Sequence, residues 1–267
     1  MMTGQLEDNK LVLATLGVSI IFGGLTALDN VNFEMERDSI TTLIGPNGAG
    51  KTTFFNCLTG IYKPTSGTIN YYPTPEKLTS LIGLAPDRIT TIGLARTFQN
   101  IRLFNNLTVL ENILIACHSR MKAGLLGALF RDSKTRAEEK AMADYSYSLL
   151  EQYGLAKSAN HLAKNLPYGD QRRLEIVRAL ATRPVILLLD EPAAGLNNQE
   201  TKDLDAFIRL IRDKEKLSVL LIEHDMSLVM SVSEKVYVME YGRVIASGPP
   251  EEIQKDPKVI KAYLGEE

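Results

Sequence analysis

The stretch Gly45-Pro46-Asn47-Gly48-Ala49-Gly50-Lys51-Thr52 fits the phosphate-binding pattern G-x-x-x-x-G-K-[ST] at every fixed position. The β-branched, apolar run 40–44 before it predicts a strand, and the run 53–58 after it predicts a buried helix. The alternative is a chance glycine-rich turn before an amphipathic helix, which these flanks disfavour. The stretch therefore predicts a binding site for a nucleoside triphosphate.

The residue types in this loop suit a triphosphate. Glycines permit positive φ and leave no Cβ in the way, so successive backbone N–H groups can point at phosphate oxygens. The helix N-terminus behind them adds a partial positive charge. We expect Lys51 to reach the β- and γ-phosphates and the Thr52 hydroxyl to bind Mg²⁺. The expected nucleotide contacts are Gly45, Pro46, Asn47, Gly48, Ala49, Gly50, Lys51, Thr52 and Thr53.

Length and charge narrow the class of protein. A chain of 267 residues can form one α/β domain with an inserted lobe or two unequal domains. The net charge of -2, with both signs spread along the chain, argues against a dedicated nucleic-acid binder. Cys57 and Cys117, the only cysteines, lie in apolar helical patterns without metal-ligand spacing, which predicts reduced core thiols in a cytoplasmic protein.

Residues 11–28 contain no charged side chain and are long enough to resemble a membrane span or a signal peptide. Three glycines and several hydroxyl residues interrupt this run, and it leads within a few residues into the phosphate loop. We therefore predict two strands joined by a turn at Phe22-Gly23-Gly24. Phe22 either stacks on an adenine ring or is a core residue at a strand end, and the sequence leaves both open.

Two further strands are expected to end in polar residues. Five apolar residues, 185–189, predict a strand buried on both faces, as in a parallel sheet. Asp190 and Glu191 follow it; we expect Asp190 to bind Mg²⁺ and Glu191 to polarise water, with a helix-capping acid pair as the alternative. Residues 219–222 repeat the pattern and place His224 to reach the γ-phosphate, unless it is a structural histidine.

The segment 100–165 has helical periodicity and no convincing strand, which predicts an inserted helical lobe. Thr108 and Glu111 form a T-x-x-E capping box for its first helix. We expect a loop at 123–130 and a second helix from Ser133 to a cap at Gly154. The expected apolar face of that helix comprises Ala137, Ala141, Tyr145, Leu149 and Leu150.

The remaining elements follow from local signals. A short strand at 68–72 is expected to be ended by Pro73 and Pro75, and a strand at 92–98 would leave Gln99 at a sheet edge. A helix from Leu166 is expected to stop before Pro184. We also expect a hairpin at 236–246, with prolines 250 and 257 starting two short helices.

With these elements placed, the chain resembles an ABC-transporter ATPase subunit over nearly its whole length. Besides the phosphate loop and Leu189-Asp190-Glu191, the family's Q-loop maps to Gln99, its D-loop to 194–197, its switch histidine to His224 and its adenine-stacking aromatic to Phe22. Its LSGGQ signature maps to Leu166-Pro167-Tyr168-Gly169-Asp170.

The resemblance implies an α/β fold: a P-loop NTPase (RecA-like) core with a mostly parallel sheet, an N-terminal antiparallel β subdomain and an inserted α-helical subdomain. It implies boundaries at 1–99, 100–165, 166–246 and 247–267. Gln99 joins Thr52 and Asp190 as an expected Mg²⁺ ligand. Glu191, His224 and Lys51 are the expected catalytic residues.

More narrowly, the runs 95–104, 168–176, 191–197 and 259–265 look like the branched-chain amino-acid importer ATPases. The signature segment departs from the family: Pro167 lacks the usual serine hydroxyl, Tyr168 replaces a glycine and Asp170 replaces a glutamine. Gly169 and the helix N-terminus remain, so Tyr168, Gly169 and Asp170 are still the expected contacts with a phosphate across a dimer.

The resemblance implies ATP and Mg²⁺ as cofactors and a cytoplasmic protein held on the inner face of the membrane by two permease subunits. A second ATPase subunit would complete the dimer, and a periplasmic-type solute-binding protein would act indirectly. Other interpretations are a superfamily ATPase acting on nucleic acid or ribosomes, an importer of another solute, or a regulatory module that binds ATP without hydrolysing it.

Overall fold

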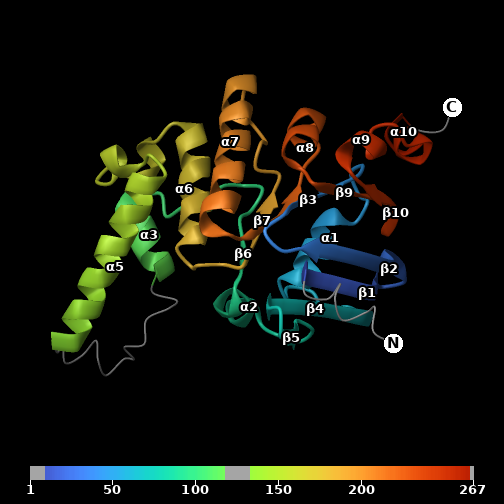
Figure 1. The fold of residues 1–267 in the computed structure, drawn as a ribbon, viewed down its shortest axis with the longest axis horizontal. Coiled ribbons are helices and arrows are strands. Elements are labelled where there is room, and N and C mark those ends of the chain that lie inside the picture. The colour runs from blue at the N-terminus through green and yellow to red at the C-terminus, as the bar shows by residue number, and fades with distance from the viewer. Residues whose placement is uncertain (1–9, 118–132, 265–267) are drawn as a thin grey trace. The chain divides into compact units, whose positions relative to one another are not determined.

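The computed structural model describes residues 10–117 and 133–264 (Figure 1). The chain divides into two compact units, Met1–Arg96 with Val185–Glu267 and Thr97–Pro184. We call them the sheet unit and the helical unit. The helical unit extends to Pro184, whereas a lobe at 100–165 was expected, so it includes the helix Tyr168–Leu180, which begins within the signature segment.

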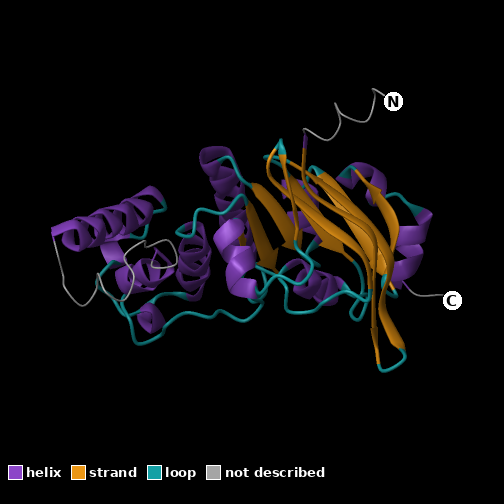
Figure 2. Cartoon of the chain, turned by 90° about the horizontal axis from the view of Figure 1, so that it is seen from below, coloured by secondary structure: helices purple, strands orange, loops and turns teal. Residues whose placement is uncertain are grey.

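The sheet unit is built around a central sheet whose six described strands have the order β10-β9-β3-β8-β7-β6. Figure 2 shows the strands of the chain with helices beside them. β3 pairs in parallel with β8 and β9, and β7 with β6 and β8, whereas β10 is antiparallel to β9. The strands are β3 (Ile40–Ile44), β6 (Leu94–Arg96), β7 (Ile186–Asp190), β8 (Ser218–Ile222), β9 (Lys235–Glu240) and β10 (Arg243–Gly248). Every residue of β3, β7 and β8 is buried, which fits their mostly apolar and β-branched sequences, although β3 includes Thr41 and Thr42.

An antiparallel sheet of order β2-β1-β4-β5 forms the rest of the β structure described in this unit. Its strands are β1 (Leu11–Phe22), β2 (Leu25–Glu36), β4 (Ser66–Thr74) and β5 (Lys77–Ser80). The uncharged run 11–28 is thus a hairpin, as predicted. Of the two prolines expected to end this strand, Pro75 follows its last residue, Thr74, but Pro73 lies inside β4, whose pairing with β5 shifts register between Tyr71 and Thr74.

Helices of the sheet unit flank its strands: α1 (Lys51–Leu58), α2 (Pro86–Ile92), α7 (Asn198–Glu215), α8 (Met226–Val232), α9 (Pro250–Ile253) and α10 (Pro257–Leu264). The strand expected at 92–98 was mostly wrong. Ile92 ends α2, Gly93 caps it at φ 114°, and only 94–96 pair with β7. Gln99 therefore lies three residues beyond the strand, in the helical unit.

The helical unit contains α3 (Val109–Cys117), α5 (Ser133–Gln152), α6 (Tyr168–Leu180) and two 3₁₀ turns at 156–158 and 163–165. The predicted capping box is confirmed, because the Thr108 N–H donates to Glu111 Oε2 and the Glu111 N–H donates to Thr108 Oγ1. Gly154 ends α5 at φ 76°, and the Leu155 N–H donates to Leu150 O.

Part of the face expected for α5 was wrong. Leu149 and Leu150 are buried, but Ala137 and Ala141 are exposed and Ser146 is buried instead. Ser146 is tolerated there because its hydroxyl lies 3.4 Å from the Cys117 thiol of α3. The loop expected at 123–130 lies outside the described residues.

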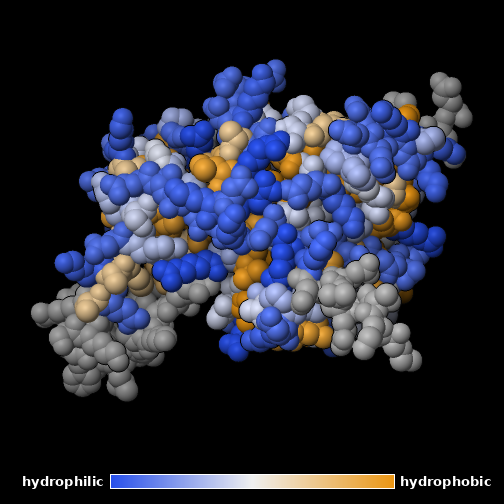
Figure 3. Space-filling view, viewed as in Figure 1, coloured by the Kyte–Doolittle hydropathy of each residue, from blue (hydrophilic) through white to orange (hydrophobic). Residues whose placement is uncertain are grey.

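Hydrophilic side chains cover most of the molecular face shown in Figure 3. Of the helices formed by residues 10–117 and 133–264, none combines the length and the apolar character that a membrane span requires.

Candidate nucleotide site

The predicted phosphate loop joins β3 to α1 and is held by its own backbone. An added Cβ at Gly45, where φ is 150°, would lie 2.1 Å from Met239 O in β9, so only glycine lets the loop approach that strand. Gly50 precedes α1 at φ 100° without a side-chain cap. Asn47, Gly48 and Thr52 are exposed, so the loop presents an open surface rather than an enclosed cavity.

Lys51 is only 8% exposed, and its ammonium group lies against the loop. It donates hydrogen bonds to Gly45 O at 2.6 Å and Pro46 O at 3.0 Å. Burial lowers the pKa of Lys51, and the negative charges of Glu191 and Asp190 act in the opposite direction. The predicted cation and the two predicted carboxylates therefore share one electrostatic environment.

Asp190 ends β7 opposite Ile222 of β8, and it is 5% exposed. Its Oδ2 accepts a hydrogen bond of 2.7 Å from Arg96, the last residue of β6. Glu191 has φ 46°, a strained value for a residue with a side chain, and its N–H donates to Ile222 O at 2.9 Å. This turn places Glu191 at the carboxyl edge of the sheet.

His224 follows β8 at the same edge. Its Nδ1 lies 3.8 Å from Glu191 Oε2, beyond hydrogen-bond distance, and 61% of its side chain is exposed. The fully buried Glu223 accepts hydrogen bonds from the N–H groups of Ala193 at 2.8 Å and His224 at 3.0 Å. Burial raises the pKa of Glu223, and the backbone N–H groups oppose this shift. Glu223 thus links the segment that follows β7 to the segment that follows β8.

A Mg²⁺ ion fits the donors present. The Thr52 hydroxyl and the Asp190 carboxylate offer the oxygen ligands that Mg²⁺ prefers. Within the described residues, no group of three or more His, Cys, Asp or Glu is arranged to hold a metal ion.

Phe22 ends β1, and 43% of its surface is exposed. Its ring packs edge-on against Tyr62, with centroids 5.1 Å apart. This exposure contradicts the interpretation of Phe22 as a core residue, and its stacking on an adenine stays a prediction.

The remaining predicted site residues belong to the helical unit: Gln99, Tyr168, Gly169 and Asp170. Tyr168, Gly169 and Asp170 form the first turn of α6, where Pro167 is the N-cap and no side chain caps the helix. Gln99 O accepts a hydrogen bond of 2.8 Å from Arg172, and Phe98 O accepts one of 2.9 Å. Arg172 also pairs with Glu175 at 2.9 Å, and both side chains are buried.

Sequence reasoning missed four polar residues near these groups: Arg96, Glu223, Arg172 and Glu175. Glu223 follows a buried apolar strand, the signal that identified Asp190, and was therefore within reach. Arg96 and Arg172 gave no such signal, because the sequence does not tell a buried arginine from an exposed one.

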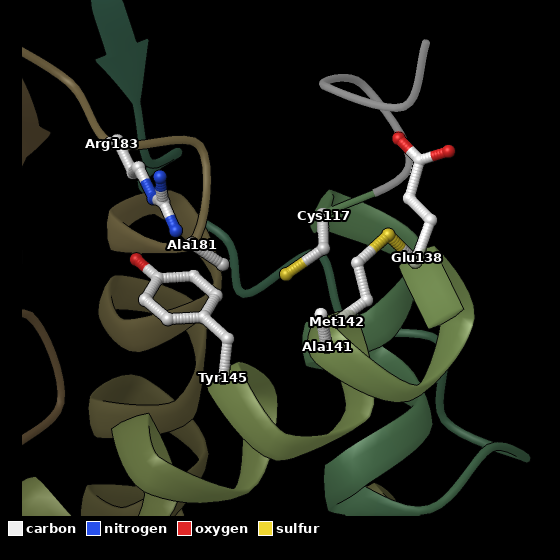
Figure 4. A pocket seen from close by; sticks show the side chains of 7 residues that line it. All are labelled: Cys117, Glu138, Ala141, Met142, Tyr145, Ala181 and Arg183. Atoms are coloured by element: carbon white, nitrogen blue, oxygen red, sulfur yellow. The ribbon is translucent and has the colours of Figure 1, made fainter. Parts of the chain in front are cut away.

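A pocket of about 190 Å³ lies within the helical unit (Figure 4). It is lined by Cys117, Glu138, Ala141, Met142, Tyr145, Ala181 and Arg183. The Arg183 guanidinium lies 4.4 Å from the centre of the Tyr145 ring. No predicted site residue lines this pocket.

Comparison with known proteins identifies the family. Residues 28–194 match the family model described as ABC transporter, and 243–267 match one described as branched-chain amino acid ATP-binding cassette transporter. The chain is 50% identical over 255 residues to the high-affinity branched-chain amino acid transport ATP-binding protein LivG of Salmonella typhimurium, covering 96% of this chain and 98% of that one. It is 48% identical over the same length to BraF of Pseudomonas aeruginosa, a protein of the same description, with the same coverage.

A solved structure agrees with these matches. The ADP conformation of an ATP-binding cassette of an ABC transporter superposes with a TM-score of 0.81 at 29% identity, covering 96% of this chain and 99% of that one. The fold expected from the sequence and the resemblance to ABC ATPases are both confirmed. The chain belongs to the ABC transporter family.

Proposed function

We propose that this chain is the ATP-binding and ATP-hydrolysing subunit of an importer for branched-chain amino acids. The observation that carries the proposal is the gathering of Lys51, Asp190, Glu191 and His224 at one edge of a parallel sheet, behind a phosphate loop. The match of 243–267 and the two relatives at about half identity support the branched-chain assignment.

Each residue has a role in phosphoryl transfer, which asks mainly for positioning and charge stabilisation. The loop N–H groups and Lys51 bind the phosphates, and Phe22 stacks on the adenine. Thr52 and Asp190 hold Mg²⁺, which neutralises phosphate charge when bound. Glu191 orients or deprotonates the attacking water, and His224 contacts the γ-phosphate. Gln99 would be a further ligand of the ion, as the family resemblance implies.

A second ATPase subunit completes the site. Asn47, Gly48 and Thr52 are exposed, so a triphosphate on this loop remains open to a partner. The uncapped first turn of α6, with Tyr168, Gly169 and Asp170, supplies N–H groups for the nucleotide of the opposite subunit. The γ-phosphate then contributes contacts that exist only in the closed dimer, and hydrolysis removes them.

Two permease subunits form the membrane path in this proposal and hold the ATPase on the inner face of the membrane. A solute-binding protein delivers the amino acid from outside. The wide sequence coverage of transport relatives favours this over an ATPase that acts on nucleic acid or ribosomes. The net charge of -2 gives no electrostatic support for the nucleic-acid alternative.

Glu191→Gln tests the assigned chemistry, because the amide keeps the shape but removes the base. We expect ATP affinity to persist, steady phosphate release to fall by about 10²-fold or more and ATP to trap a dimer in gel filtration. Glu251→Gln, an exposed change in α9, is the matched control. Normal phosphate release by the Glu191 variant would refute the role. A wild type that binds ATP without releasing phosphate, with or without its permeases, would instead favour a regulatory module.

Uptake by vesicles that contain the assembled transporter tests the solute. We expect ATP-dependent accumulation of leucine, isoleucine or valine, and none with the Glu191→Gln subunit. ATP-dependent uptake of a different solute alone would overturn the branched-chain assignment and leave the ATPase assignment intact.

A further inference from the structure

Arg96 is a buried arginine that joins two parts of the nucleotide site. It ends β6, and only 7% of its side chain is exposed. One terminal nitrogen donates to Asp190 Oδ2 at 2.7 Å. The other donates to Asn56 Oδ1 at 2.7 Å and to Thr59 Oγ1 at 3.3 Å.

Asn56 and Thr59 belong to the phosphate-loop side of the site. Asn56 lies in α1, which begins at Lys51, and Thr59 is its C-cap. The Arg96 guanidinium also lies 5.4 Å from the centre of the Phe55 ring of the same helix. One side chain therefore fastens the helix behind the phosphate loop to the carboxylate at the end of β7.

The planar fork suits this task. A guanidinium carries its donors in a rigid plane, so holding Asn56 fixes the direction from which Asp190 is held. A lysine ammonium has the charge but a single compact head, which does not reproduce two fixed directions. Because Oδ2 of Asp190 is engaged by Arg96, the orientation of Oδ1 is also set.

We propose that Arg96 is a positioning residue for the Mg²⁺ site: it orients Asp190 and ties it to the phosphate-loop helix through Asn56. This inference rests on the proposed function, because it assumes that Asp190 serves the metal. Arg96 touches neither nucleotide nor metal in this account, and acts through the carboxylate that it holds. Removing a residue that orients a metal ligand in this way typically lowers metal affinity by about 10- to 100-fold.

Binding of Mn²⁺, a substitute for Mg²⁺, measured by electron paramagnetic resonance in the presence of a non-hydrolysable ATP analogue tests the proposal. For Arg96→Met we expect Mn²⁺ affinity to fall about 100-fold, and for Arg96→Lys about 10-fold. Binding of the analogue without metal, followed by fluorescence, should change less than about 2-fold in both, because the loop and Lys51 are untouched.

Asn56→Ala separates positioning from charge, since it leaves the Arg96–Asp190 pair in place. We expect a fall of about 3- to 10-fold in Mn²⁺ affinity, and no further fall when it is combined with Arg96→Met. This variant also keeps the test decisive if Arg96→Met fails to fold. Arg243→Met is the matched control, because Arg243 pairs with Asp29 on the surface of the same unit, and it should leave Mn²⁺ affinity unchanged.

Unchanged or tighter Mn²⁺ binding in Arg96→Met would overturn the proposal and show that the arginine only opposes the metal charge. Unchanged binding in Asn56→Ala would overturn the link to α1. Failure of the wild type to bind the ATP analogue would instead refute the proposed function, so the two failures are distinguishable.

Discussion

Two buried arginines, one in each unit, do different work. Arg96 in the sheet unit pairs with Asp190, a predicted metal ligand, and with two polar side chains of the phosphate-loop helix region. Arg172 in the helical unit pairs with Glu175 and with the backbone carbonyls of Phe98 and Gln99. Arg96 therefore holds a side chain of the proposed metal site, whereas Arg172 holds a buried glutamate and the backbone of its own unit.

The two arginines differ in how much of the carboxylate that each one pairs with is already engaged in hydrogen bonds. Glu175 is used on both oxygens: Oε2 accepts from Arg172, and Oε1 accepts from the Arg102 N–H at 3.1 Å. That network fastens the segment 98–102 to α6 and lies within one unit. Asp190 is held by Arg96 through Oδ2 and ends a strand at the edge where other site residues gather. We infer that the buried pair links parts of the chain within the helical unit, whereas Arg96 orients a site residue in the sheet unit.

The largest expected effect is on Arg172→Met. The change leaves Glu175 as a buried charge without its cation, which typically costs about 3–5 kcal/mol. The free energy of unfolding of the helical unit, measured by urea denaturation, should fall by this amount. Replacing both partners, Arg172→Met with Glu175→Leu, should recover much of the loss because no charge is left buried. If the double variant is no more stable than the single one, the pair is not the source of the cost.

Gly45→Ala should have the next largest effect, and it acts on the sheet unit through backbone geometry alone. Its Cβ would lie 2.1 Å from Met239 O at a φ of 150°. We expect about 1–3 kcal/mol of destabilisation, with a larger relative loss of ATP affinity because the loop must move away from β9. Denaturation and fluorescent-nucleotide titration measure the two. Gly83→Ala is the control, since φ there is also positive but an added Cβ meets no neighbour.

Glu223→Gln tests how a third buried charge makes the stability of the fold depend on pH. Burial raises the pKa of Glu223, so the folded protein takes up a proton at a pH where the unfolded chain does not. Lowering the pH from that raised pKa toward the ordinary glutamate value of about 4.3 therefore stabilises wild type relative to the variant. A tenfold difference in proton affinity between the folded and the unfolded state corresponds to about 1.4 kcal/mol. Urea midpoints of both proteins between pH 7 and pH 5 measure the effect; a difference that stays constant with pH would contradict the raised pKa.

The sequence predicted the sheet unit well because its signals are local. The phosphate loop, the apolar strands 40–44, 185–189 and 219–222, and the hairpin in 11–28 are each marked by residue type and spacing. The resemblance then gave the family, which the comparisons confirm. The roles of the individual site residues stay predictions, with the experiments above as their tests.

The errors and omissions have two physical causes, a local helix cap and long-range pairing. The strand expected at 92–98 fails because Gly93 ends α2, and only three residues find a partner in β7. Pro73 stays inside β4 because of a register shift against β5. Arg96 meets Asp190 across 94 residues of sequence, and Arg172 meets Phe98 across 74. No local pattern encodes such contacts, so these residues were found only in the fold.

Arg243→Met should have the smallest effect. It tests whether burial, rather than ion pairing itself, accounts for the large loss of stability expected for Arg172→Met. Arg243 donates to Asp29 Oδ2 from Nε at 2.8 Å, a geometry as good as that of Arg96 with Asp190, but 69% of its side chain is exposed. Water already solvates both charges, so we expect a change in the free energy of unfolding of about 0–1 kcal/mol, smaller still at high salt. Urea denaturation at low and high salt measures it. A loss as large as that of Arg172→Met would mean that the ion pair matters wherever it lies, and the distinction drawn from burial would fail.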